Sequence, residues 1–284
     1  MTGGADSRCI RQDALADLAD VPAVSRWVRS AELRLHVLDY GGELPPVVIL
    51  PGITSPAICM DFVARRLTDL VRPVVVDIRG RGLSDDGDGY DLDAYAEDTE
   101  AVIGGLGLDC PVLLGHSMGA RIAALTAARA KVPTRGTVLV DPPTSGPGRD
   151  PYPTTLDMFL AQLAQARAGT TADEVAQSWP RWPRREQELR ARWLASCSEE
   201  SIVASHRGFE TEDFFATWPA VPAPTVFVYG AQSLVVPEAR VREAEQTNPH
   251  AELVEVPSAG HMVFWDNPDV AVEVVRGALS ATLT

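Results

Sequence analysis

The sequence contains few cysteines and no clustered metal ligands. Its four cysteines, Cys9, Cys59, Cys110 and Cys197, are scattered, form no CxxC pair and pair with no nearby histidine. A structural zinc site needs closely spaced thiolate and imidazole ligands. We therefore expect no metal and no other cofactor, and buried free thiols in place of disulfides.

Long apolar runs and an excess of positive charge are also absent. No run approaches the ~20 apolar residues of a membrane span, and the polar stretch 1–20 lacks the apolar centre of a signal peptide. We therefore expect a cytoplasmic protein without a membrane partner. Lys131 is the only lysine and the formal net charge is −14, whereas a nucleic-acid partner requires a basic surface. The expected partner is a small molecule, and the chain is either a monomer or a small homo-oligomer.

Short apolar runs alternate with helical segments along most of the chain. We expect strands at 25–29, 33–38, 47–50, 74–76, 112–114, 137–140, 225–229 and 252–256. Helices are expected at 91–106, 118–130, 238–247 and 269–279. Continuous apolar runs are typical of strands buried on both faces. The alternation predicts an α/β fold with a mainly parallel sheet and helices on both faces.

The alternation breaks between residues 142 and 224, where no convincing strand occurs. This region carries helical stretches and four of the six tryptophans: Trp179, Trp182, Trp193 and Trp218. We therefore divide the chain into an N-terminal arm (1–24, either mobile or a short helix), a core (25–145 and 220–284) and a helical insertion (146–219).

The segment Gly115-His116-Ser117-Met118-Gly119 fits the pattern G-x-S-x-G. An expected strand precedes it and an expected helix follows it, which is the context that the pattern requires. Glycines on either side permit a sharp turn that holds the serine in a strained conformation with its Oγ exposed. The start of the helix adds a positive dipole where an oxyanion would form. The segment therefore predicts Ser117 as a nucleophile.

Three further segments agree with this pattern in order and spacing: "LPGIT" at 50–54, "DIRGRGLSD" at 77–85 and "SAGHMVFWDNP" at 258–268. On these residues the chain resembles the α/β-hydrolase superfamily, over nearly its whole length outside the arm and the insertion. The resemblance implies the α/β-hydrolase fold, with the insertion as a helical cap (lid) over the nucleophile. It also implies that the backbone N–H groups of Ile53 and Met118 form an oxyanion hole.

Elimination among the five histidines favours His261 as the general base. His36 lies in an early strand, His116 adjoins Ser117, His206 lies in the insertion and His250 lies in a polar turn. His261 follows the last expected strand, and the resemblance implies the same role.

The carboxylate that would orient this base is missing from its usual position. In the superfamily it follows the strand that here reads "VFVYG", but the chain has Ser233 there. Three alternatives compete: Asp141 at the end of "TVLVDPP", Glu238 after Pro237, or no acid at all, as in a non-catalytic ligand receptor. We favour Asp141, because sites of parallel sheets lie at the carboxyl ends of the strands and adjacent strands are about 5 Å apart.

The segment "VDPPTSGPGRDPYP" that contains Asp141 is similar to the N-formylmaleamate deformylases of nicotinic acid degradation. The related 2-(acetamidomethylene)succinate hydrolases also carry the acid here. This resemblance implies a Ser-His-Asp hydrolase that cleaves a small acyl-amide in a carboxylate-bearing substrate, such as N-formylmaleamate to maleamate and formate. Ester, lactone or C–C bond hydrolysis and cofactor-free quinolone dioxygenation remain alternatives.

A substrate carboxylate requires arginine or backbone donors. The candidate substrate-binding residues are Thr54, Arg149, Tyr152, His206, Arg207 and Phe209. The cap residues among them also have a structural interpretation, as surface arginines or packed aromatics. Five other arginines lie among glutamates and are expected on solvated helix faces: Arg181, Arg184, Arg185, Arg190 and Arg192.

Overall fold

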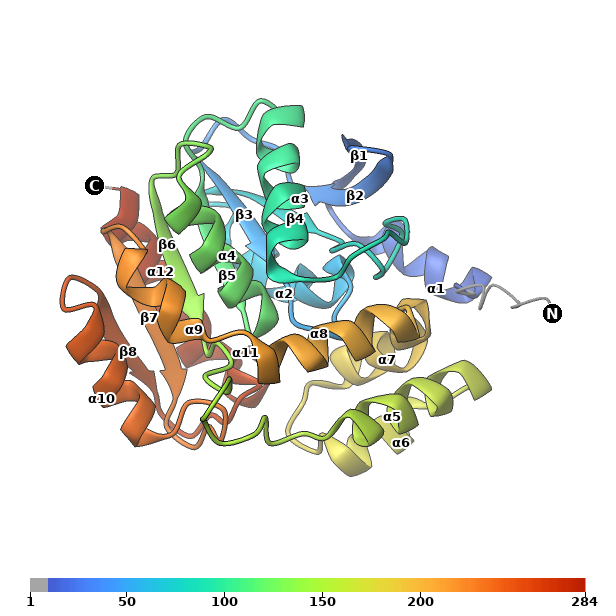
Figure 1. The fold of residues 1–284 in the computed structure, drawn as a ribbon. Coiled ribbons are helices and arrows are strands. Elements are labelled where there is room, and N and C mark those ends of the chain that lie inside the picture. The colour runs from blue at the N-terminus through green and yellow to red at the C-terminus, as the bar shows by residue number, and fades with distance from the viewer. Residues whose placement is uncertain (1–9, 284) are drawn as a thin grey trace.

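The computed structural model describes residues 10–283, which form one eight-stranded sheet with the order β1-β2-β4-β3-β5-β6-β7-β8 (Figure 1). The pairs β1–β2 and β2–β4 are antiparallel, and all later neighbours are parallel. All eight predicted strands are present, with ends within two residues of prediction. They are β1 (Val24–Ser30), β2 (Leu33–Asp39), β3 (Pro46–Leu50), β4 (Arg72–Val76), β5 (Val112–His116), β6 (Gly136–Val140), β7 (Thr225–Gly230) and β8 (Glu252–Val256).

The central strands are buried on both faces, which explains their continuous apolar sequence. In β5 the side chain of Leu113 packs into one hydrophobic cluster, whereas Val112 and Leu114 pack into the cluster on the opposite face. Successive side chains of a strand point to opposite faces, so an unbroken apolar run fills both clusters. The expected parallel sheet is confirmed.

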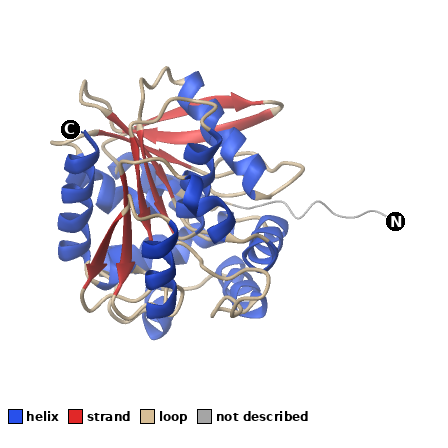
Figure 2. Cartoon of the chain, turned by 60° about the vertical axis from the view of Figure 1, so that its left-hand side comes forward, coloured by secondary structure: helices blue, strands red, loops and turns tan. Residues whose placement is uncertain are grey.

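Helices cover both faces of this sheet (Figure 2). On one face lie α3 (Leu92–Gly105), α4 (Met118–Arg129) and α10 (Glu238–Thr247). On the other lie α2 (Asp61–Ala64), α11 (Val263–Asp266) and α12 (Pro268–Leu283). The apolar residues of α4 and α12 fill different clusters, as an α/β fold with helices on both faces requires.

Between β6 and β7 the chain forms five α-helices, the first four beyond the carboxyl ends of the parallel strands and the last packed on one face of the sheet (Figure 1). They are α5 (Leu156–Ala168), α6 (Ala172–Ser178), α7 (Arg184–Trp193), α8 (Glu199–Thr211) and α9 (Phe214–Thr217). This end of a parallel sheet is where ligand sites form, so the first four helices are placed to cover one.

The expected N-terminal arm is described only from residue 10 onwards, and residues 1–9 lie outside the described part. In the described part of this arm, α1 (Gln12–Asp17) is a short helix. Its last residue, Asp17, accepts hydrogen bonds from Arg192 and Trp193 of α7. Cys59 is a buried free thiol, and Cys197 is fully buried. None of the helices described over residues 10–283 is long and apolar enough to cross a membrane.

Candidate active site

Ser117 occupies the sharp turn between β5 and α4. Its φ is 56° and its ψ is −121°, a strained conformation for a residue with a side chain. A Cβ on Gly115 would lie 2.2 Å from the Gly119 carbonyl oxygen, and one on Gly119 would lie 1.9 Å from the Leu50 carbonyl oxygen. The turn therefore has no room for larger residues at these two positions, which is why the sequence places glycine on both sides of the serine.

The structure brings together the three residues that the sequence nominates for the chemistry. His261, in the loop after β8, lies with its Nε2 2.9 Å from Ser117 Oγ. Its Nδ1 lies 2.8 Å from Oδ2 of Asp141, which is fully buried. In this arrangement Nδ1–H donates to the carboxylate, and Nε2 can accept the proton of the serine hydroxyl.

Asp141 follows β6 directly and has a positive φ of 49°. Its Oδ1 accepts a hydrogen bond of 2.9 Å from the Gly230 N–H. Ser233, at the position where the acid was missing, donates its hydroxyl to Asp141 Oδ2 at 2.6 Å. The same hydroxyl oxygen accepts from the N–H groups of Val235 and Val236. Ser233 therefore ties the loop after β7 to the carboxylate that contacts His261.

The alternative acid, Glu238, does not share this arrangement. It begins α10, its side chain is 80% exposed, and its carboxylate accepts a hydrogen bond from Arg242 of the same helix. This is the ordinary environment of an acidic residue in the first turn of a helix. The geometry thus favours Asp141 over Glu238 as the partner of the imidazole.

Two backbone groups near Ser117 are available for an oxyanion. Met118 is the first residue of α4, so its N–H has no acceptor within the helix. Ile53 lies in the loop after β3, and its carbonyl accepts a hydrogen bond of 3.0 Å from Nε of the buried Arg81. The guanidinium of Arg81 also donates to Ser201 and Ser205 of α8. Arg81 therefore fixes the Ile53 loop and joins it to the helical insertion.

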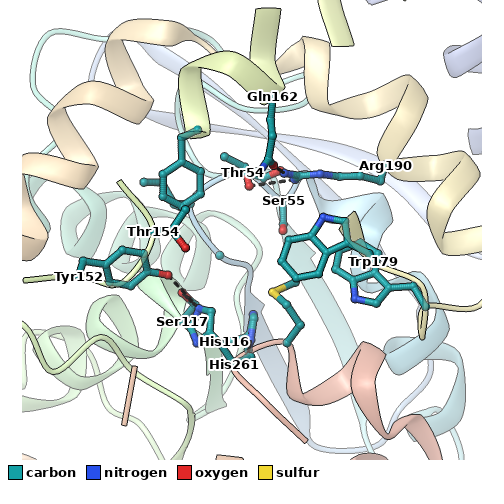
Figure 3. A pocket seen from close by; sticks show the side chains of 15 residues that line it. Thr54, Ser55, His116, Ser117, Tyr152, Thr154, Gln162, Trp179, Arg190 and His261 are labelled. Atoms are coloured by element: carbon teal, nitrogen blue, oxygen red, sulfur yellow. Dashed lines mark hydrogen bonds between the residues drawn. The ribbon is translucent and has the colours of Figure 1, made fainter. Parts of the chain in front are cut away.

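A cavity of about 60 Å³ lies between the insertion and the Ser117 turn (Figure 3). This volume is small beside the about 300–1,000 Å³ of pockets for drug-sized ligands. A wider surface hollow adjoins the cavity and shares five lining residues with it: Thr154, Trp179, Trp182, His261 and Met262. The cavity is lined by Gly52, Ile53, Thr54, Ser55, His116, Ser117, Tyr152, Thr154, Phe159, Gln162, Trp179, Trp182, Arg190, His261 and Met262.

His116 lines the cavity as a neutral imidazole. Its Nε2 lies 2.9 Å from the carbonyl oxygen of His261, so Nε2–H is the donor. Burial lowers the pKa of His116 to about 3, and its Nδ1 has no hydrogen-bond partner. The residue therefore anchors the backbone of the histidine that contacts Ser117.

Residues 47–274 match the model of the α/β hydrolase family. The chain belongs to this family. It is 40% identical to the N-formylmaleamate deformylase of Pseudomonas putida strain KT2440, over 84% of this chain and 89% of that protein. It is 28% identical to the 2-(acetamidomethylene)succinate hydrolase of Mesorhizobium japonicum, over 95% of this chain and 100% of that one. Among solved structures, an N-formylmaleamic acid deformylase from Pseudomonas putida superimposes with a TM-score of 0.84 and 36% identity, covering 89% of this chain and 100% of that chain.

In this α/β hydrolase, two of the predicted substrate-binding residues lie at the cavity: Thr54 and Tyr152. The Tyr152 hydroxyl is 3.1 Å from His261 Nε2, and burial raises the pKa of this phenol above its ordinary value. His206 and Phe209 do not line the cavity. Their rings pack against Tyr152 with centroid distances of 6.1 and 4.8 Å, and His206 donates to the Thr154 carbonyl. They support the cavity wall from behind.

The structure does not place the two predicted arginines at this cavity. Arg149 forms ion pairs with Asp213 and Glu243, which already neutralise its guanidinium. Arg207 is exposed on α8 and lines a different surface hollow. The geometry therefore gives no support to their interpretation as ligands of a substrate carboxylate.

Arg190, in contrast, lies at the cavity although the sequence did not predict it there. It was expected on a solvated helix face, but it is only 8% exposed and lines the cavity with Ser117 and His261. The prediction is wrong because the glutamates near it in sequence point elsewhere: Glu186 contacts Arg185, and Glu188 contacts Arg184. Sequence reasoning also missed the lining residues Ser55, Thr154, Phe159, Gln162 and Met262.

Proposed function

We propose that this α/β hydrolase is a serine hydrolase that cleaves N-formylmaleamate into maleamate and formate. The observation that carries the proposal is the hydrogen-bonded line from Ser117 through His261 to Asp141 at the wall of a small cavity. The 40% identity to an N-formylmaleamate deformylase supports the choice of substrate.

In the first half of the proposed reaction, Ser117 Oγ attacks the formyl carbon and His261 Nε2 takes the hydroxyl proton. Asp141 stabilises the imidazolium through Nδ1–H. The oxyanion accepts hydrogen bonds from the N–H groups of Met118, the residue after the nucleophile, and of Ile53 in the loop after β3. His261 then gives the proton to the amide nitrogen, the C–N bond breaks and maleamate leaves. The formyl group remains as an ester of Ser117.

In the second half, a water molecule loses a proton to His261 and attacks the ester carbon. Collapse of the second tetrahedral intermediate releases formate and returns the proton to Ser117 Oγ. The leaving group thus departs as a neutral amide, and the enzyme is regenerated without a metal or an oxidant.

We further propose that residues 146–219 act as a cap over a core of residues 25–145 and 220–284. The cavity supports this division, because its lining comes both from core loops, such as Thr54 and His261, and from cap helices, such as Gln162 and Arg190. A cytoplasmic location and a role in nicotinic acid degradation are parts of the same proposal, and the similarity to the deformylase supports the pathway.

The proposal is tested by incubating the purified protein with N-formylmaleamate and measuring formate with a coupled dehydrogenase. We expect formate and maleamate in equal amounts from the wild type and none from Ser117→Ala. Absence of formate from the wild type would reject the substrate. Parallel assays with 4-nitrophenyl esters, lactones and a hydroxyquinolone, the last with an oxygen electrode, identify the alternative chemistry in that case.

A further inference from the structure

Arg190 is a buried cation in the wall of the cavity that contains Ser117. It projects from α7, and Figure 3 shows it beside Thr54 and Gln162, across the cavity from Tyr152 and Ser117. Its Nη1 donates to the carbonyl oxygen of Thr54 at 2.8 Å and to Thr54 Oγ1 at 2.9 Å. Its Nη2 donates to Gln162 Oε1 at 3.0 Å. All three acceptors are neutral.

No carboxylate neutralises Arg190 within residues 10–283. Its neighbours on α7 differ: Arg184 pairs with Asp173, Arg185 with Asp61, and Arg192 with Asp17. Burial lowers the pKa of Arg190, which is the effect of a cation removed from water without an opposing charge. A buried charge without a counter-charge destabilises the fold. An anionic ligand in the cavity would neutralise Arg190 and offset this cost.

We propose that Arg190 is a specificity-determining residue that binds the carboxylate of the substrate, at the end remote from the bond that Ser117 cleaves. The inference rests on the proposed function, because the single carboxylate of N-formylmaleamate lies at the end opposite its formyl group. A guanidinium matches a carboxylate with two parallel N–H donors. Thr54 Oγ1 and Gln162 hold the fork in place.

The position of Thr54 connects this contact to the chemistry. Thr54 is adjacent in sequence to Ile53, the proposed oxyanion donor, and both of its oxygen atoms accept from Arg190. One guanidinium therefore holds the oxyanion loop in place and recognises the far end of the substrate. The cavity selects a short, anionic acyl-amide with its carboxylate and formyl group at opposite ends.

The first test needs no variant. The wild type is assayed with N-formylmaleamate and with its neutral counterpart, in which a primary amide replaces the carboxylate. We expect kcat/KM to be about 100-fold lower for the neutral compound, because loss of one member of a buried charge pair has an effect of this order. Equal kcat/KM values for the two compounds would overturn the proposal.

The second test uses Arg190→Gln with Arg184→Gln as the matched control, since Arg184 lies on the same helix but pairs with Asp173 at the surface. Arg190→Gln is expected to lower kcat/KM for the anionic substrate by about 100-fold and to erase the preference for the anion, whereas an effect transmitted through the oxyanion loop lowers kcat for both substrates alike. Arg184→Gln should behave as the wild type. A loss that is equal for the anionic and neutral substrates would assign Arg190 a structural role only and overturn the proposal.

A binding measurement separates this inference from the proposed function. If the wild type releases no formate from N-formylmaleamate, the substrate is wrong, but the cavity can still bind a small carboxylate. Titration calorimetry with maleate is then expected to show binding to the wild type and to Arg184→Gln, and affinity about 100-fold weaker for Arg190→Gln. Maleate binding that is unaffected by Arg190→Gln, or absent from the wild type, would overturn the role of Arg190.

Discussion

Asp141 is the only carboxylate that the described part of the chain places against His261 Nδ1, at 2.8 Å. We predict that Asp141→Asn lowers kcat for N-formylmaleamate by about 10³–10⁴-fold, because an amide in this place favours the wrong imidazole tautomer and carries no charge. Steady-state kinetics measure the effect. Glu238→Gln is the control and should leave kcat unchanged, since Glu238 is bound to Arg242 on the surface. A large loss of kcat in Glu238→Gln, with none in Asp141→Asn, would identify Glu238 of α10 as the acid that orients His261.

Ser233 and Asp141 are within hydrogen-bond distance of one another, at 2.6 Å, and occupy two alternative positions for the same charge. We predict that the double variant Asp141→Ser/Ser233→Asp recovers at least about tenfold of the kcat lost in Asp141→Ser, because a carboxylate in this place restores the partner of His261. The single variant Ser233→Asp places two carboxylates side by side and should lose both activity and stability. A double variant no more active than Asp141→Ser would show that the loop after β7 cannot present the acid.

At the level of residues, the sequence could predict side chains that a local pattern specifies. The glycines around Ser117 and the loop that contains His261 are such patterns, and Asp141 followed from the order of strands. Arg190 could not be predicted from its acidic neighbours, because the partner of a long side chain depends on tertiary packing. The sequence does contain one indication, because the apolar residues Trp193 and Leu194 follow Arg190 at helical spacing. Both are buried in the structure. Residues three and four apart share a helix face, so this spacing indicates a buried Arg190.

At the level of elements, the strands were predictable because their buried apolar runs are continuous, as in β5 and β6. The four-residue helices α2 and α11 could not be predicted, since one turn is too short for a helical period. In the insertion, composition predicts helices but not which faces meet the core. The cap–core contact between α7 and α2 illustrates this, because it joins Arg185 to the fully buried Asp61.

Glu186, which lies next to Arg185 in this contact, makes the free energy of unfolding depend on pH. Glu186 of α7 is 4% exposed and its Oε2 has no hydrogen-bond partner. Burial raises the pKa of Glu186 to about 7, partly offset by Arg185. The pKa of Glu186 is thus higher in the folded protein than in the unfolded chain. The contribution of Glu186 to folding stability is therefore fully present below about pH 4.5 and is lost as the pH rises through about 7.

We therefore predict that Glu186→Gln, which stays neutral, is more stable than the wild type at pH 8 by on the order of 1–3 kcal/mol. At pH 4.5 the two proteins should have equal free energies of unfolding. Urea denaturation at the two pH values measures the difference. A difference of the same size at both values would assign the effect of the substitution to packing and not to ionisation.

At the scale of the whole molecule, loops of the sheet and helices of the insertion together line one small cavity, with Ser117 and the buried Arg190 in its wall. Loops at the carboxyl ends of the strands contribute Ser117, His261 and Thr54, and the segment between β6 and β7 contributes Tyr152 and Arg190. Under the proposed function, these groups determine which carbonyl of a substrate meets Ser117 Oγ. For N-formylmaleamate, the proposed substrate, we predict that this orientation presents the formyl carbon and that the intermediate on Ser117 is a formyl ester.

The group that Ser117 carries during turnover distinguishes the proposed deformylase reaction from every alternative. The enzyme is mixed with N-formylmaleamate, quenched in acid within one turnover, and the peptide that contains Ser117 is examined by mass spectrometry. We predict a mass increase of one formyl group on Ser117, and none in Ser117→Ala. A maleyl group on Ser117, or a formyl group on another residue, would contradict the proposed attack of Ser117 on the formyl carbon.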